Sequence, residues 1–210
     1  MFDAFLPFDG AIAQWIATTF QPGAGTFWDT LWVWITRAGD GGFLWIALGV
    51  ALLLFRKTRK AGIVTLIALA FNGILTNAII KPLLSRDRPY NIDFIAWAKD
   101  YVYPALTKSP GDKSFPSGHT AISFAGACGL FFGLRPDWLG SAKPRLWAIL
   151  GIVLAALVGF SRLFLGVHYA TDVLAGAVVG ALCAFAAMAL LRKLEPVLNR
   201  RWPKIFASKA

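Results

Sequence analysis

Charged residues are scarce in this chain of 210 residues, at 15% against 57% hydrophobic residues, and the mean hydropathy is +0.60. A soluble globular domain usually carries about 25% charged residues. The shortage argues against a water-exposed globule and favours an integral membrane protein. Acidic residues are scarcer still, 11 against 21 basic ones, for a net charge of +10. The basic residues cluster between apolar runs and form no continuous basic face, so nucleic-acid binding is not expected.

Cysteine is also rare, and the start of the chain lacks basic residues. The two cysteines, Cys128 and Cys183, both fall inside apolar runs. We interpret them as small buried hydrophobic residues, which argues against a disulfide framework or a cysteine metal site. The segment from Met1 to Ala4 is acidic, where a secretory signal peptide would be basic. No cleavable signal is therefore expected, and the first membrane span is expected to direct insertion.

The apolar runs predict an all-α, polytopic membrane helix bundle. A helix needs about 20 apolar residues to span a bilayer core of about 30 Å. The second and fifth of five runs meet that length, and the first and fourth are expected to extend into their flanks, back to Trp32 and on to Leu165. Gly, Ala and Ser recur in the last three runs, and such small residues let membrane helices approach closely. The runs are Gly41–Phe55, Ala61–Ile80, Ser117–Leu134, Leu146–Phe160 and Val173–Leu191.

Residues 1–40 mix aromatic and aliphatic residues with aspartate and threonine, and a break at Gln21-Pro22-Gly23 divides them into two short helical candidates. We expect amphipathic helices at the membrane interface, with their tryptophans at the head groups. A sixth, weakly hydrophobic span is the alternative. The domain prediction is an interfacial segment at 1–40, a transmembrane domain at 41–191 and a basic cytoplasmic tail at 192–210. The tryptophans are Trp15, Trp28, Trp32 and Trp34.

Three basic clusters predict the orientation in the membrane. They lie at 56–60, 135–145 and 192–209, and five spans place all three on one side. The positive-inside rule makes that side cytoplasmic. The 81–116 connection and the 161–172 turn then face the outer side. The connection from Pro82 to Phe115 is the only long one, and long connections in compact domains are usually functional or mobile.

Lys81 and Arg88 place two cations at the end of the second run. The lysine has a simple alternative, which is to extend toward the lipid head groups. Pro89 restricts the backbone after Arg88, and a guanidinium held in place suits bidentate recognition of a phosphate. We interpret Arg86 as a surface charge, and Asp87 is its candidate partner.

The segment Pro116-Ser117-Gly118-His119 has the composition of a helix start. Ser117 suits the N-cap position, and Gly118 lets a ligand approach the backbone. Free N–H groups and the positive end of the helix would attract an anion. His119, in the first turn, would point toward the same ligand. The alternative is an interfacial capping motif with a passive histidine.

A third motif contains Arg162, His168 and Asp172. His168 and Asp172 are spaced i, i+4, so on a helix they would share one face. A carboxylate there can hold one imidazole nitrogen and fix the tautomer, which leaves the other nitrogen as a nucleophile toward phosphorus. Arg162 would bind an oxygen of the phosphoryl group. The alternative is a helix-start histidine that is paired only for stability.

A metal site is the weaker interpretation of these residues. His119, His168 and Asp172 could coordinate zinc, but three cations beside them would repel it. No metal or other cofactor is therefore expected.

The three motifs together resemble the signatures of the type 2 phosphatidic acid phosphatase (PAP2) superfamily, over residues 40–191. The resemblance implies metal-independent hydrolysis of a phosphate ester through a phosphohistidine on His168. It implies that Asp172 orients His168 and that His119 protonates the leaving oxygen and then activates water. The matching segments are Lys81-x6-Arg88-Pro89, Pro116-Ser117-Gly118-His119 and Ser161-Arg162-x5-His168-x3-Asp172. Its phosphate-binding residues would be Lys81, Arg88, Ser117, Gly118 and Arg162.

The small size and the outward site resemble bacterial members of this superfamily, in the inner membrane with the site toward the periplasm. The implied partners are the bilayer and a lipid phosphate, with no obligate protein partner. Undecaprenyl pyrophosphate is favoured, because the five-span layout and short N-terminus resemble the bacitracin-resistance type. Phosphatidylglycerol phosphate, phosphatidate and lipid A are the alternative substrates. A non-catalytic lipid-phosphate binder or transporter is the alternative of another class.

Overall fold

Helices form every regular element of the residues that the structure describes. The computed structural model describes residues 2–20, 27–91, 111–135, 139 and 143–201. The break at 21–23, most of the long connection and the last part of the basic tail lie outside these ranges. The elements are η1 (Asp3–Phe5), α1 (Leu6–Phe20), α2 (Phe27–Arg37), η2 (Asp40–Gly42), α3 (Phe43–Leu53), α4 (Arg59–Gly73), η3 (Ile74–Ile80), α5 (Lys81–Leu84), η4 (Pro89–Asn91), α7 (Gly118–Gly133), α9 (Lys143–Phe164) and α10 (Ala170–Arg201).

Four stretches are long and apolar enough to cross a membrane. They correspond to the first, second, fourth and fifth predicted runs, and each is longer than its run, although the first ends at Leu53 instead of Phe55. The third run forms α7, which has 16 residues and is shorter than the roughly 20 residues that a span needs. The four candidate spans are Phe27–Leu53, Arg59–Asn91, Arg145–Phe164 and Ala170–Arg201.

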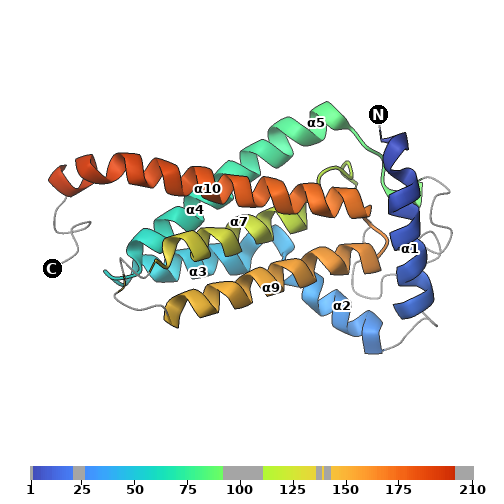
Figure 1. Ribbon diagram of the computed structural model, residues 1–210, viewed down its shortest axis with the longest axis horizontal. Coiled ribbons are helices and arrows are strands. Elements are labelled where there is room, and N and C mark those ends of the chain that lie inside the picture. The colour runs from blue at the N-terminus through green and yellow to red at the C-terminus, as the bar shows by residue number, and fades with distance from the viewer. Residues whose placement is uncertain (1, 21–26, 92–110, 136–138, 140–142, 202–210) are drawn as a thin grey trace.

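α7 packs against α4, α9 and α10 in the middle of the bundle (Figure 1). Small residues permit these contacts. A Cβ atom on Gly180 of α10 would lie 2.3 Å from the Ala121 carbonyl oxygen, and one on Gly133 would lie 2.5 Å from Ala61 Cα. Such distances are too short for any side chain, so the helices meet backbone to backbone. The predicted use of small residues for close helix packing is confirmed.

The first span begins earlier than the sequence predicts. α2 and α3 belong to one candidate span of 27 residues, which bends where Gly41 and Gly42 adopt φ angles of 54° and 69°. The sequence predicts α2 as a separate interfacial helix, because its polar residues lower its hydropathy. Two of these residues, Asp29 and Thr36, are buried inside the protein, so their polarity does not report contact with water or head groups.

α1 lies across the ends of α9 and α10 (Figure 1). Its Ile16 packs in an apolar cluster with Trp32, Phe164 and Leu165. The interfacial prediction for Trp32 is wrong, since the residue is 7% exposed and its ring centroid lies 4.7 Å from that of Phe160. The other three tryptophans, Trp15, Trp28 and Trp34, do present large exposed surfaces.

The second span changes helix type just before the predicted phosphate site. η3 is a π-helix that leads directly into α5, which begins at Lys81. π-helical segments are rare and frequently occur at functional sites. Thr76 within η3 donates a hydrogen bond of 3.0 Å to Asn72 Oδ1. The two buried side chains, Thr76 of the π-helix and Asn72 of α4, therefore hydrogen-bond to each other inside the bundle.

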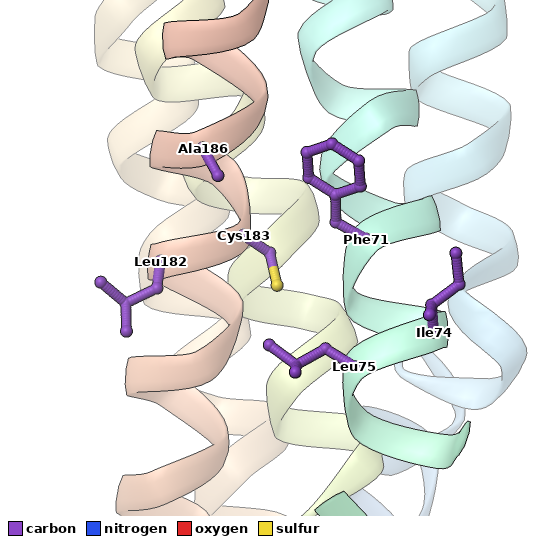
Figure 2. Close-up of a pocket in the computed structure, with 6 residues that line it drawn as sticks. All are labelled: Phe71, Ile74, Leu75, Leu182, Cys183 and Ala186. Carbon is purple, nitrogen blue, oxygen red and sulfur yellow. The ribbon is translucent and has the colours of Figure 1, made fainter. Parts of the chain in front are cut away.

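An apolar pocket of about 350 Å³ lies between the second span and α10 (Figure 2). One wall comes from α4 and η3, and the other comes from α10. Cys183 lines it, and both Cys183 and Cys128 are buried free cysteines, as predicted. The full lining is Phe71, Ile74, Leu75, Leu182, Cys183 and Ala186.

The two ends of the bundle differ in their chemistry. The α3–α4 turn and the last turns of α10 lie at one end (Figure 1), where Lys60 pairs with Glu195. The end of α9, the start of α10 and helix α1 lie at the other end. The predicted motifs gather at this second end.

Candidate active site

The three motifs meet in one pocket of about 200 Å³. Lys81 comes from the start of α5, His119 from the first turn of α7, and Arg162 from the last turn of α9. Arg88 and His168 come from the turns before η4 and α10. The structure thus brings both histidines and three predicted cations to one cavity. Its full lining is Gly39, Gly41, Asn72, Asn77, Lys81, Arg88, Asp112, Gly118, His119, Ile122, Arg162 and His168.

Asp172 and Ser114 hold one side of the His168 ring. His168 Nδ1 lies 3.4 Å from Asp172 Oδ2 and 3.3 Å from Ser114 Oγ. The same carboxylate oxygen accepts hydrogen bonds from Ser114 Oγ and from the Tyr169 N–H. His168 stands in the turn before α10 and Asp172 in its first turn, so the pair is a helix-start contact and not the predicted pair on one helix face. Nε2 is left on the side of the pocket cations.

His168 is neutral at ordinary pH. Burial lowers the pKa of His168 to about 3, against the opposing effect of its hydrogen bond to Asp172, and the Arg88 charge lowers it further. A buried site disfavours the charged imidazolium. A neutral imidazole keeps the lone pair that a nucleophile needs.

Arg88 faces His168 from a buried, fixed position. Its Nε and Nη1 donate to the Asp112 and Val167 carbonyl oxygens, each at 2.8 Å. Nη1 also lies 3.2 Å from His168 Nε2. A guanidinium held from several sides is a preorganised donor for an anion beside the imidazole.

Asp112 lies between two of the cations, which nothing in the local sequence indicates. Lys81 Nζ pairs with its Oδ2, and Arg88 Nη2 donates to its Oδ1 at 2.6 Å. Burial opposes the charge of Asp112, but the hydrogen bond from Lys81 and the charges of Arg88 and Lys81 outweigh it and lower the pKa of Asp112 to about 2. The Asp112 carboxylate shows that two anionic oxygens fit between Lys81 and Arg88.

The start of α7 is as predicted except for the side chain of its N-cap residue, Ser117. Ser117 is the N-cap residue but makes no side-chain capping bond, and its Oγ accepts a hydrogen bond of 2.9 Å from Thr120. Ser117 is buried, and its N–H donates to the Asp172 carbonyl at 3.0 Å. Gly118 lines the pocket, where a Cβ would lie 3.7 Å from Lys81 Nζ. The positive end of the helix therefore lies at the pocket.

His119 contacts a carboxylate from the first span. Its Nε2 lies 2.8 Å from Asp40 Oδ1, and Asp40 directly precedes the two glycines at the bend. By sequence, Asp40 falls in the predicted interfacial segment, where no role is indicated for it. The Asp-Gly-Gly turn is the one sequence signal that could have drawn attention to it.

Arg162 reaches the pocket from the inner side of α9. It is buried, and its Nη1 donates to Thr36 Oγ1 of α2 at 2.7 Å. The first span therefore touches both Arg162 and His119.

The prediction that Arg86 is a surface charge paired with Asp87 is wrong. Arg86 is 5% exposed and donates to Asp172 Oδ1 at 2.7 Å and to Asp9 Oδ2 at 2.8 Å. Asp87 pairs with Lys113. The reason is tertiary, because the rings of Phe2 and Tyr169 lie over this guanidinium and its carboxylate partners come from α1 and α10.

Within the described ranges, no group of three or more His, Cys, Asp or Glu side chains is arranged to hold a metal ion. The pocket is lined mainly by cations, imidazoles and amides. These groups together suit an anion with several oxygen atoms.

Comparisons with known proteins identify the family of this chain. The model of the PAP2 superfamily matches residues 60–196. The undecaprenyl-diphosphatase of Sulfolobus acidocaldarius is 33% identical over 176 residues, which cover 80% of this chain and 76% of the relative. The lipid A 4'-phosphatase of Bacteroides thetaiotaomicron is 30% identical over 185 residues, which cover 84% of this chain and 76% of the relative.

A solved structure shows the same fold. The transmembrane PAP2-type phosphatidylglycerolphosphate phosphatase from Bacillus subtilis superposes with a TM-score of 0.70 at 27% identity, covering 91% of this chain and 88% of that chain. The family match contains all three motifs, from Lys81 to Asp172. The chain therefore belongs to the PAP2 superfamily and is an integral, multi-pass membrane enzyme that hydrolyses phosphate groups of lipids.

Proposed function

We propose that this enzyme releases orthophosphate from a lipid pyrophosphate or phosphate through a phosphohistidine intermediate, with undecaprenyl pyrophosphate as its preferred substrate. The observation that carries the proposal is the single pocket lined by His168, His119 and three cations. A binding site would need only the cations. Two imidazoles in different surroundings supply the nucleophile and the acid that hydrolysis requires.

In the first step, His168 Nε2 attacks the phosphorus atom. A nitrogen–phosphorus bond forms while the bond from phosphorus to the leaving oxygen breaks. Asp172, next to Nδ1, stabilises the positive charge that develops on the ring. His119 donates its proton to the leaving oxygen.

In the second step, water attacks the phosphohistidine. His119, now neutral, takes a proton from this water, and the nitrogen–phosphorus bond breaks to free His168 and orthophosphate. The charge on the other phosphoryl oxygens is greatest in the two transition states. Preorganised donors stabilise that charge, and those that line the pocket are Lys81, Arg88, Arg162 and the Gly118 amide. Ser117, the other predicted phosphate-binding residue, is buried and does not line the pocket.

The substrate preference is supported by the relatives. The Sulfolobus relative, 33% identical, is an undecaprenyl-diphosphatase. Relatives of similar identity act on lipid A or phosphatidylglycerol phosphate, as their names state. These two lipids and phosphatidate are the alternative substrates.

We also propose that α7 crosses the membrane in addition to the four candidate spans, which makes five spans in all. The site would then lie on the periplasmic side of a bacterial inner membrane. The positive-inside rule supports this orientation, because the basic clusters lie between and after the spans at the end opposite the site. The proposed transmembrane domain begins at Phe27, where the first candidate span starts, instead of at 41, and it ends at 191. Residues 192–210 are proposed as a cytoplasmic tail. The interfacial part of 1–40 would be α1.

The test is a substrate panel in mixed micelles with EDTA present. Undecaprenyl pyrophosphate, phosphatidylglycerol phosphate, phosphatidate and lipid A are compared by orthophosphate release. We expect the highest kcat/KM for undecaprenyl pyrophosphate, and a loss of about 10³-fold or more in kcat for His168→Ala, which lacks the nucleophile. Full turnover by that variant would exclude the phosphohistidine. Lipid binding by the wild type without orthophosphate release would favour a binder or transporter.

A further inference from the structure

Asp9 of α1 is a buried carboxylate that the proposed mechanism does not use. It is 2% exposed and precedes the residues matched by the family model, 60–196. Burying a charged carboxylate is costly unless it is paired and hydrogen-bonded. Its partners therefore indicate its role.

Two of the groups that bind Asp9 belong to one residue, Thr171, at the start of α10. Asp9 Oδ1 accepts the Thr171 N–H at 2.9 Å, and Asp9 Oδ2 accepts the Thr171 hydroxyl at 2.9 Å. The first N–H groups of a helix have no partner within the helix. Asp9 thus caps α10 from another helix, with its negative charge at the positive end of the helix dipole.

The third partner leads to the reacting histidine. Arg86 Nη2 donates to Asp9 Oδ2 at 2.8 Å, and Arg86 Nη1 donates to Asp172 Oδ1 at 2.7 Å. The Tyr169 ring covers the guanidinium, with Arg86 Cζ 3.6 Å from the ring centroid. Asp172 Oδ2 is the oxygen beside His168 Nδ1. Arg86 therefore fixes one oxygen of the carboxylate whose other oxygen faces the imidazole.

We propose that Asp9 is a positioning residue that holds the Asp172 carboxylate against His168 through Arg86 and Thr171. Without Asp9, the Arg86 charge has Asp172 as its remaining carboxylate partner and draws it away from the imidazole. The start of α10 also loses its cap. This inference rests on the proposed roles of His168 and Asp172.

The experiment is a double-mutant cycle on the full chain in mixed micelles, with Asp9→Ala, Asp172→Asn and the pair. We expect Asp9→Ala to lower kcat by about 10- to 100-fold, the size of effect that a small misplacement of a reacting group produces. KM should stay within about twofold, because Asp9 is separate from the groups that line the pocket. In the Asp172→Asn background, Asp9→Ala should cause little further loss, since coupled residues are not additive.

Ile16→Ala is the matched control on the same helix. Ile16 is 1% exposed and anchors α1 in its apolar cluster, so this variant weakens the docking of α1 without removing a group from the Asp172 network. It should lower the melting temperature and leave kcat unchanged below it. If Asp9→Ala does not fold, Asp9→Asn carries the same comparison, because it keeps the size and one acceptor for Thr171.

The outcomes separate this inference from the function on which it rests. An active wild type with unchanged kcat in Asp9→Ala would overturn the positioning role and leave the phosphatase mechanism standing. An equal fold-loss in both backgrounds would also overturn it, because that pattern indicates general destabilisation. A wild type that releases no orthophosphate from any lipid would overturn both.

Discussion

The two histidines occupy different surroundings, and the difference suits two different roles. His168 is buried between Asp172, Ser114 and Arg88, and the low pKa of His168 keeps it neutral. The side chain of His119 is 27% exposed and contacts Asp40. A neutral ring suits the nucleophile, and a ring beside a carboxylate suits the acid. Such separation of environments is how one site provides both groups near neutral pH.

Asp40→Asn is expected to lower kcat by about 10-fold and to move the alkaline limb of the pH–rate profile to lower pH by about one unit. The carboxylate, 2.8 Å from Nε2, favours protonated His119, so its loss leaves less general acid at a given pH. Profiles of kcat/KM for both proteins check this. Glu195→Gln, which removes a carboxylate at the opposite end of the bundle, is the control. An unmoved alkaline limb in Asp40→Asn would contradict the assignment.

The buried state of His168 predicts a loss of stability in acid. Its pKa is about 3 in the folded protein, against 6.5 for an unperturbed histidine such as that of an unfolded chain. Between these pH values His168 is protonated in the unfolded chain but not in the folded protein. The free energy of unfolding therefore decreases as the pH falls from 6.5 to about 3. The contribution is about 1.4 kcal/mol per pH unit at most. Melting temperatures from pH 7 to pH 4 should fall more steeply for the wild type than for His168→Gln, and parallel curves would refute this prediction.

At the scale of helices, the packing of α7 against α10 places the site. Gly176 and Gly180 of α10 lie against the backbone of α7 at Ser117 and Ala121. This contact brings the start of α7, with His119, beside the start of α10, with Asp172. The small residues that the sequence uses for close packing therefore also set the distance between the motifs.

Gly180→Ala is expected to destabilise the protein by about 1–3 kcal/mol, the usual cost of overpacking. The added Cβ would lie 2.3 Å from one backbone atom and 2.7 Å from another, and backbone atoms cannot move aside like the end of a flexible side chain. Gly73→Ala in α4 is the control, because a Cβ there meets nothing within 4 Å. Thermal unfolding in detergent should show a lower melting temperature for Gly180→Ala alone. Equal melting temperatures would contradict the backbone-contact argument.

At the scale of the whole molecule, the basic clusters between and after the spans lie at the end of the bundle opposite the pocket. The turn before α4 and the end of α10 lie at one end of the bundle (Figure 1), and both carry basic residues. The pocket includes His168, which directly precedes the start of α10 at the other end. In the proposed orientation the basic end is cytoplasmic, and the pocket is then at the outer surface of the membrane. A lipid head group could then enter the pocket while its chains stay in the bilayer.

Reporter fusions at the C-terminus test this orientation. A fluorescent protein that folds only in the cytoplasm should fluoresce, and a phosphatase that is active only in the periplasm should stay inactive. The reverse result would place the pocket in the cytoplasm. Fusions at the 56–60 turn should behave like the C-terminal ones, because both basic clusters are expected on the same side.

Several features of this protein follow from the sequence by itself. Hydropathy predicts the membrane bundle and four of its spans, because burial in lipid requires long apolar helices. The three motifs predict both histidines and the cations at one site, because cations and imidazoles in apolar surroundings are costly without a ligand or partner. These are properties of short segments, so local composition is enough.

The tertiary structure alone decided how the site is supported. Asp9, Asp40 and Asp112 reach Arg86, His119 and Lys81 across large sequence separations. Nothing in the local sequence distinguishes Asp9 or Asp112 from interfacial or surface charges, and for Asp40 the only signal is the Gly41-Gly42 pair that follows it. Polar residues in 1–40 lower the hydropathy of that stretch in the same way whether they contact water or polar groups inside the protein. Only the packing of α1 against α10 and of α2 against α9 shows that Asp9 binds Thr171 and that Thr36 binds Arg162 inside the protein.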